Sequence, residues 1–405
     1  MTEALRARDD KDVEEAIRWA LSAGKALEVV GRGSKRLLGR PIQTDVTLDV
    51  SALSGVTLYE PEELVLSARA GTPLAEIEAL VDAKGQQLAF EPMDCGPILG
   101  GTAAAGSLGG TLAANLCGPR RIKAGAARDH FLGVRAVSGR GESFKSGGRV
   151  VKNVTGYDLC KLLAGSFGTL AVMTEVTVKT LPRPETEATV IVLGLEDATA
   201  GRAMAAAMGS ACDVSGAAHL PAALVMFFDG LHAIQAATVF RLEGFAPSVR
   251  HRRDALAALL RPFGTVEHVD ESHSRALWRS IRDVTPFAGS SPWSERPLWR
   301  VSTAPARGAA LAARLPPDAA AFSDWAGGLL WIAMPPCDDA GAQVVRAAVA
   351  EIGGHATLVR APAAVRAAVD VFQPQERALA AVSKRVKDGF DPKGVLNPGR
   401  MWAGV

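Results

Sequence analysis

The chain has few cysteines, and none of them is closely paired along the sequence. Its five cysteines are Cys95, Cys117, Cys160, Cys212 and Cys337, and no two of them form a C-x-x-C pair. Zinc ribbons, iron–sulfur clusters and attached c-type haem all need closely spaced cysteines, so the sequence argues against these centres. We expect the thiols to pack as small buried hydrophobic groups.

Long apolar runs and an excess of charge of one sign are also lacking. The longest apolar runs, residues 222–228 and 329–334, have the length of strands, far below the roughly 20 residues of a membrane-spanning helix. A net charge of +2 without a basic, aromatic-rich stripe argues against a nucleic-acid surface. Residues 13–21 predict an amphipathic helix and not a secretory signal. We therefore expect a cytoplasmic protein with at most peripheral membrane contact through partners.

The chain is instead rich in glycine next to small residues, in three separate segments. The first, residues 31–36, follows a predicted buried strand and presents successive amides and three cations, as a pyrophosphate site would. The second covers residues 108–119 and 124–129, and the third is the turn at residues 165–172. One such segment alone is equally typical of a surface loop. Three of them predict backbone that a large flat cofactor can approach closely.

Two better-known nucleotide-binding loops fail on their spacing. A Rossmann unit needs G-x-G-x-x-G before a crossover helix, but Arg36 stands where the third glycine belongs. Gly39 and Pro41 also break the only candidate helix. Residues 101–106 match the start of a P-loop, but the required Lys and Ser/Thr do not follow. We reject both alternatives.

The length of 405 residues predicts more than one domain. Pro182 and Pro184 disfavour helix and strand alike, so we place a domain boundary there. Before it, we expect strands at residues 27–30, 46–50, 64–70, 133–138 and 170–180, and helices at 13–23 and 73–84.

After this boundary the pattern β-α-β-β-α-β occurs twice. The first pass has strands at residues 189–193, 222–228, 238–242 and 266–269 and helices at 198–208 and 249–260. The second has strands at 298–302, 320–325, 329–333 and 356–360 and helices at 306–315 and 341–352. This predicts either a ferredoxin-like repeat or one larger antiparallel sheet backed by helices. A helix near residues 375–387 follows.

In their order and spacing, the glycine segments resemble a known family. Together with residues 118–121, 128–133, 152–158 and 390–401, they look like the FAD-binding domain of the vanillyl-alcohol oxidase and p-cresol methylhydroxylase superfamily. Within it, the closest likeness is to the E subunits that bind FAD in bacterial glycolate oxidase. The middle of the chain matches weakly.

The resemblance implies an α+β fold in three parts. These are a p-cresol methylhydroxylase-type FAD-binding domain (residues 1–184), an antiparallel-sheet α+β cap domain (185–362), and a C-terminal helix and segment that return to the FAD domain (363–405). It implies non-covalent FAD, because no His or Cys lies between residues 31 and 44, with Cys117 as a minor exception. The FAD contacts that it implies are Gly31, Arg32, Gly33, Ser34, Lys35, Gly109, Gly110, Thr111, Ala113, Ala114, Gly118, Gly125, Asp129, Gly168 and Val172.

The resemblance also implies an activity, the oxidation of small 2-hydroxy acids such as glycolate to glyoxylate. Electrons would pass to a catalytic flavoprotein subunit and an iron–sulfur subunit. Phe167 and Ala171 depart from the G-S-E-G-T-L-G turn of relatives that act alone, which favours a subunit of a complex. A free-standing FAD-dependent 2-hydroxy-acid dehydrogenase and a non-catalytic, flavin-binding assembly subunit stay open as alternatives.

Catalytic and metal-binding residues cannot be assigned from the sequence. Residues 267–273 carry two histidines five positions apart, which would not share a helix face, and this favours a solvated polar segment over a metal site. His130 follows Asp129 and is better explained by packing or positioning than by catalysis. We therefore predict no metal site and leave the catalytic base unknown.

Overall fold

The computed structural model describes residues 3–149 and 156–405. Its contacts divide the chain into two compact units. The first comprises Met1–Cys117, Gly125–Arg183 and Pro374–Val405, and the second comprises Gly118–Ala124 and Pro184–Gln373. Residues 152–155 of the family-like segment lie outside the described residues.

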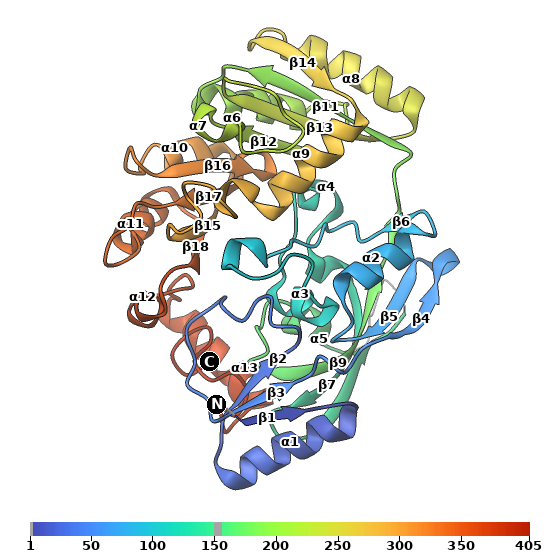
Figure 1. Cartoon of the computed structure of the whole chain (residues 1–405), viewed down its shortest axis with the longest axis vertical. Helices are drawn as coiled ribbons and strands as arrows, with labels where there is room; N and C mark the ends of the chain where they lie inside the picture. The colour runs from blue at the N-terminus through green and yellow to red at the C-terminus, as the bar shows by residue number, and fades with distance from the viewer. Residues whose placement is uncertain (1–2, 150–155) are drawn as a thin grey trace. The chain divides into compact units, whose positions relative to one another are not determined.

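The first unit begins with a three-stranded parallel sheet covered by a helix (Figure 1). The sheet has the order β1-β3-β2, with β1 at Glu3–Arg6, β2 at Leu27–Val30 and β3 at Val46–Asp49. Helix α1 (Asp10–Ala23) begins where Asp9 accepts a hydrogen bond from the Asp12 amide and ends at Gly24, whose φ is +63°. Its residues Val13, Ile17 and Ala20 are buried at helical spacing, so α1 packs one face into the core.

A five-stranded antiparallel sheet forms the rest of the first unit's core. Its order is β4-β5-β9-β7-β8, at Val56–Glu60, Val65–Arg69, Ala171–Lys179, Phe131–Ser138 and Ser143–Gly147. A short sheet pairs β6 (Gln86–Gln87) with β10 (Leu181–Pro182). The helices of this unit are α1, α2 (Leu74–Asp82), α3 (Leu108–Ala114), α5 (Leu159–Leu163) and α13 (Arg377–Phe390).

The second unit is built on one eight-stranded antiparallel sheet of order β14-β11-β13-β12-β16-β17-β15-β18. The strands are β11 (Thr186–Leu193), β12 (Gly216–Leu220), β13 (Ala237–Gly244), β14 (Thr265–Val269), β15 (Leu298–Ser302), β16 (Ala320–Asp324), β17 (Leu329–Ala333) and β18 (His355–Arg360). The helices are α4 (Arg121–Ala124), α6 (Asp197–Met208), α7 (Ala222–Val225), α8 (Ala246–Leu260), α9 (Glu271–Asp283), α10 (Gly308–Ala312), α11 (Ala342–Ile352) and α12 (Ala363–Ala368).

Two β-α-β-β-α-β halves make this sheet, and they meet at its centre. Strands β11 to β14 form one half and β15 to β18 the other, and each half has the strand order of a ferredoxin-like unit. Between the halves, β12 and β16 share a single registered pair, His219 with Ser323. Both arrangements predicted from the sequence are therefore present, because two ferredoxin-like halves join into one sheet.

The predicted α+β class is confirmed, but one predicted strand is wrong and one helix was not predicted. Residues 222–228 are not a strand: α7 begins after Pro221, and the strand lies just before it, at Gly216–Leu220. The glycine and alanines of that strand have low strand propensity, so its pattern is weak. Helix α9 was not expected. Asp270 caps it by accepting from the His273 amide, and Leu277, Trp278 and Ile281 are buried.

The connection between β2 and β3 tests the Rossmann alternative, and the helices can be checked for membrane-spanning length. Strands β2 and β3 pair in parallel, although no α-helix connects them. The turn after β2 is therefore not the crossover of a Rossmann unit. In the part of the chain that the structure describes, no helix is long and apolar enough to cross a membrane.

Candidate functional site

The first unit contains a cleft beside the first glycine segment. The space that it bounds, including the part open to solvent, is about 550 Å³. Its lining comes from four places in the sequence: the end of β2 with its turn, α3, the turn at Phe167, and the C-terminal segment. The lining residues are Glu28, Val29, Val30, Gly31, Arg32, Gly33, Ser34, Lys35, Arg36, Ser107, Gly110, Ala113, Ala114, Phe167, Asn397 and Arg400.

The turn after β2 has the chemistry of an anion site. Among the described residues, the amides of Arg32, Gly33, Ser34 and Lys35 donate no hydrogen bond to another backbone group. Gly33 adopts a φ of +78°, which the absence of a side chain permits. Amides left without a protein partner beside a cleft suit a phosphate group, which accepts several hydrogen bonds.

Two of the three predicted cations remain beside this turn. Lys35 Nζ lies 3.5 Å from Thr111 Oγ1 on α3, and the Arg32 side chain is exposed. Arg36 instead pairs with Glu28, with Nε 2.9 Å from Oε1. The sequence pattern alone gave no sign of this pairing, since both residues are polar and Glu28 lies in a strand.

Helix α3 also lines the cleft, and a glycine allows it to lie against Ala70, the residue that follows β5. A Cβ atom on Gly109 would stand 2.7 Å from the carbonyl oxygen and the Cβ of Ala70, so only glycine fits. Ser107 caps the helix by accepting from the Gly110 amide at 3.3 Å. A second hollow of about 470 Å³ shares Gly31, Gly110 and other residues with the first and extends to Gly109, Gly168 and Val172.

The C-terminal segment supports both the turn and the cleft. Asn397 Oδ1 accepts from the Val29 amide at 2.8 Å, and its Nδ2 donates to the Phe167 carbonyl at 2.8 Å. Arg400 Nη2 donates to the carbonyls of Lys35 (3.1 Å) and Arg36 (2.6 Å). This one segment therefore fixes the first and third glycine segments at the same time.

A buried ion pair anchors this segment. Lys387 on α13 and Asp391 lie 2.7 Å apart, with side chains 3% and 0% exposed. Lys387 also donates to the Thr169 and Leu396 carbonyls, and Asp391 accepts from the Val395 and Leu396 amides. Burial lowers the pKa of Lys387, while the charge of Asp391 opposes that shift.

Eleven of the expected contacts line the first cleft or its extension, and four lie elsewhere in the structure. The first cleft is lined by Gly31, Arg32, Gly33, Ser34, Lys35, Gly110, Ala113 and Ala114, and its extension adds Gly109, Gly168 and Val172. Thr111 is a buried residue of α3, and its hydroxyl donates to the Ser107 carbonyl. Gly125 and Asp129 form a local turn, in which Asp129 accepts from the Ala126 amide at 2.8 Å. Gly118 belongs to the second unit, where its carbonyl accepts from Trp325 Nε1 at 3.1 Å.

Beyond β2 and its turn, the lining residues that were not among the predicted contacts are Ser107, Phe167, Asn397 and Arg400. The last two lie in the family-like closing segment, which was a usable signal. Phe167 adopts a φ of +52°, a left-handed conformation that costs a residue with a side chain free energy. Hydrogen bonds hold it there, from its own amide to the Ala113 carbonyl and from Asn397 to its carbonyl.

Other candidate groups have structural roles. His130 is fully buried, with its ring centroid 5.4 Å from that of Phe90. Burial raises the pKa of the Cys160 thiol to about 12, so this thiol stays protonated and unreactive. His268 lies in β14 and His273 in α9. Within residues 3–149 and 156–405, no group of three or more His, Cys, Asp and Glu side chains is arranged to hold a metal ion.

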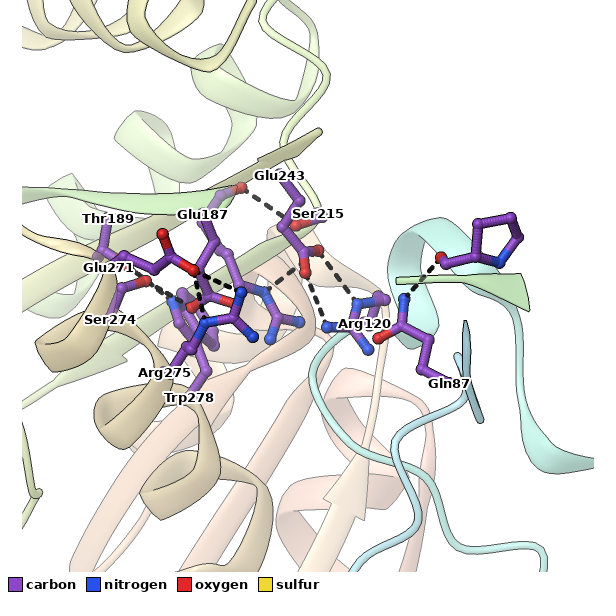
Figure 2. Close-up of polar contacts among 12 residues, drawn as sticks. Gln87, Arg120, Glu187, Thr189, Ser215, Glu243, Glu271, Ser274, Arg275 and Trp278 are labelled. Atoms are coloured by element: carbon purple, nitrogen blue, oxygen red, sulfur yellow. Dashed lines mark hydrogen bonds and ion pairs between the residues drawn. The ribbon is translucent and has the colours of Figure 1, made fainter. Parts of the chain in front are cut away.

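The second unit contains a buried network of charged side chains (Figure 2). Arg120 donates to Glu243 through Nε at 3.1 Å and Nη2 at 2.7 Å, with side chains 12% and 9% exposed. Burial raises the pKa of Glu243, but the charges of Arg241 and Arg120 outweigh burial and lower it to about 2. Arg241 lies over the Trp278 ring at 4.7 Å. Burial raises the pKa of nearby Glu187.

Comparison with known proteins defines the class to which this fold and cleft belong. Residues 3–147 match a family model described as an FAD binding domain. The fold matches that of p-cresol methylhydroxylase with substrate bound, with a TM-score of 0.72 and 14% identity over 99% of this chain and 88% of that chain. The chain is thus a flavoprotein of the p-cresol methylhydroxylase fold, which confirms the expected fold and FAD. The cleft fits this cofactor for two reasons. The amides of residues 32–35 have no backbone partner and can donate hydrogen bonds to a pyrophosphate, and small residues line the backbone nearby.

The sequence comparison is more specific. The chain is 34% identical to glycolate oxidase subunit GlcE of Escherichia coli (strain K12) over 396 residues, which cover 96% of each protein. The chain therefore belongs to the family of glycolate oxidase subunit GlcE. It is also 32% identical to glycolate oxidase subunit GlcD of Bacillus subtilis (strain 168) over 168 residues, 41% of this chain and 34% of that protein.

Proposed function

We propose that this chain is the FAD-binding subunit of a complex that oxidises small 2-hydroxy acids, with glycolate converted to glyoxylate. The similarity to GlcE over 96% of both chains supports this function. The main structural support for FAD binding is that the amides of residues 32–35 have no backbone partner and line a cleft together with small residues. We further propose that its partners are a catalytic flavoprotein subunit and an iron–sulfur subunit, in the cytoplasm or peripherally at the membrane.

In this proposal the chain's own residues bind and orient the cofactor. The amides of residues 32–35 would hold the pyrophosphate, and Arg32 and Lys35 would balance its charge. Gly31, Gly109, Gly110, Ala113 and Ala114 would lie beside the pyrophosphate and ribityl chain, and Gly168 and Val172 at the adenine or ribose end. FAD, when bound, supplies the hydride acceptor for the oxidation.

The departure at Phe167 favours a subunit over an enzyme that acts alone. Phe167 lines both hollows at the position where self-sufficient relatives carry an acid. An apolar ring at that place supplies no charge and accepts no proton, so this residue can shape the cleft but cannot act as a base.

The test is an anaerobic titration of the FAD-loaded chain with glycolate, followed by absorbance in the flavin bands. We expect the flavin to be reduced only after the partner subunits are added. Reduction in the isolated chain would instead support a free-standing dehydrogenase. Failure of the purified chain to retain FAD would overturn the proposal and leave an assembly role.

A further inference from the structure

The second unit contains a hollow that the proposed flavin site does not use. It lies among α6, α7, α10 and strands β12 and β16, and its space, including the part open to solvent, is about 990 Å³. Most of its wall is apolar. Its apolar lining residues include Met204, Leu224, Leu315, Phe322 and Leu330.

The hollow lies where the two halves of the eight-stranded sheet meet. His219 of β12 and Ser323 of β16, the single registered pair between the halves, both line it. Helix α6 of one half and helix α10 of the other both line the hollow, which therefore lies at the junction of the two halves.

One glycine keeps the hollow open. Gly201 lies in the interior of α6 and lines the hollow, and a Cβ atom built on it would meet no other atom within 4 Å. Glycine weakens a helix interior relative to alanine, and neither a positive φ nor a close contact requires it here. Its consequence is space beside the helix that any larger residue would occupy.

The polar end of the hollow carries a negative charge. The Asp197 carboxylate accepts a hydrogen bond from His219 Nε2, with Oδ1 and Nε2 3.1 Å apart. On its other side, His219 Nδ1 lies 2.9 Å from Thr238 Oγ1, so both ring nitrogens are engaged. The hydrogen bond from His219 lowers the pKa of Asp197 and keeps it ionised near neutral pH. The Asp197 side chain is 51% exposed, so the carboxylate remains open to a further donor.

We propose that this hollow binds a small amphiphilic amine, with the apolar part of the ligand among Met204, Leu224 and Leu330 and its ammonium group on Asp197. An ammonium group donates several hydrogen bonds and complements the carboxylate charge, whereas a 2-hydroxy acid carries the same charge as Asp197. The site is therefore distinct from the one for the proposed substrate. It does not depend on the function of the flavin.

The probes are n-hexylamine, 1-hexanol and hexanoate, each titrated into the FAD-loaded full chain by isothermal titration calorimetry. These molecules share one chain length and differ in the charge of the end group. We expect n-hexylamine to bind at least about tenfold more tightly than 1-hexanol, and hexanoate not to bind, since a charged hydrogen bond typically changes affinity by that factor or more.

Two variants locate the binding. Asp197→Asn keeps the size of the side chain and removes its charge, so it should weaken n-hexylamine about tenfold and leave 1-hexanol unchanged. Gly201→Leu places a side chain in the hollow and should abolish binding of both, while far-UV circular dichroism and FAD content report that the variant is folded. Equal affinity of the wild type for all three probes, no binding of n-hexylamine, or binding that survives Gly201→Leu in a folded protein would overturn the proposal.

Discussion

The two units of the chain solve the problem of polar groups in different ways. In the first, the amides of residues 32–35 supply the polar surface, and a distant C-terminal segment holds the turn that presents them. In the second, side chains distant in sequence, such as Arg120 and Glu243, form ion pairs in the interior, whereas the buried pair of the first unit, Lys387 with Asp391, joins residues only four positions apart. A backbone site needs glycine and leaves a visible sequence pattern, whereas an ion pair joins residues that are 123 positions apart and leaves none. The cofactor site of the first unit can therefore be predicted from the sequence, whereas the long-range ion pair of the second unit cannot.

The largest expected effect comes from the ion pair that anchors the C-terminal segment. Asp391→Asn leaves the buried Lys387 ammonium without its counter-charge, so we expect a loss of about 3–5 kcal/mol in the stability of the first unit. FAD should also bind more weakly, because the same segment carries Asn397 and Arg400. Urea unfolding and flavin fluorescence titration measure the two effects.

The matched control lies one turn away on the same helix. Asp388 pairs with Lys384 at the surface, with side chains 46% and 53% exposed, so Asp388→Asn should cost less than about 1 kcal/mol. If the two variants unfolded at the same urea concentration, the anchoring role of Asp391 would be refuted.

Next in size is the ion pair of the second unit, which has a distinct pH dependence. Glu243 has a pKa of about 2 in the folded chain, below the value of about 4.3 for an unfolded glutamate. Its stabilising effect is therefore present above about pH 4.3 and is lost as the pH falls towards 2. Glu243→Gln should cost about 3 kcal/mol at pH 7, and this difference from the wild type should shrink at pH 3.

Urea unfolding of both proteins at pH 7 and pH 3 measures this difference. Asp213→Asn is the control, since Asp213 pairs with Lys123 at the surface of the same unit. A difference between wild type and Glu243→Gln that stayed constant from pH 7 to pH 3 would contradict the assigned charge state of Glu243.

A smaller effect is expected at Arg400, where a substitution should change FAD affinity separately from the stability of the first unit. Arg400→Ala removes the hydrogen bonds to the carbonyls of Lys35 and Arg36, so the turn should lose its fixed shape and FAD affinity should fall about 10-fold to 100-fold. Arg400→Lys keeps the charge but not the forked geometry and should recover only part of the affinity. Wild-type FAD affinity in Arg400→Ala would show that the turn holds its shape unaided.

The smallest effect is expected at Gly201 in the second unit. Gly201→Ala should stabilise α6 by about 0.5–1 kcal/mol, because alanine is the better residue in a helix interior and its Cβ meets open space. FAD affinity should not change. A destabilised Gly201→Ala variant, seen as a lower thermal midpoint, would mean that the space beside α6 is smaller than described.

Much of the fold followed from local patterns in the sequence. Buried residues at helical spacing predicted α1, and glycine beside small residues predicted the turn at residues 31–36 and the wall at Gly109. The repeated β-α-β-β-α-β order also followed, apart from the strand at Gly216–Leu220 and helix α9. Small residues gave that strand no pattern, and the polar residues 267–273 obscured the start of that helix, although Asp270 is a good capping residue.

Glycine positions alone predict where a cofactor can approach the backbone closely, because glycine acts through its own φ angle and the space at its own Cα. The contacts that hold that backbone in place are seen only in the folded chain. Asn397 bonds to the Val29 amide across 368 positions, Gly118 lies with the second unit, and Asp197 meets His219 beside an open hollow. Such pairings depend on how the chain closes on itself, and no local pattern encodes which distant residue will complete a site.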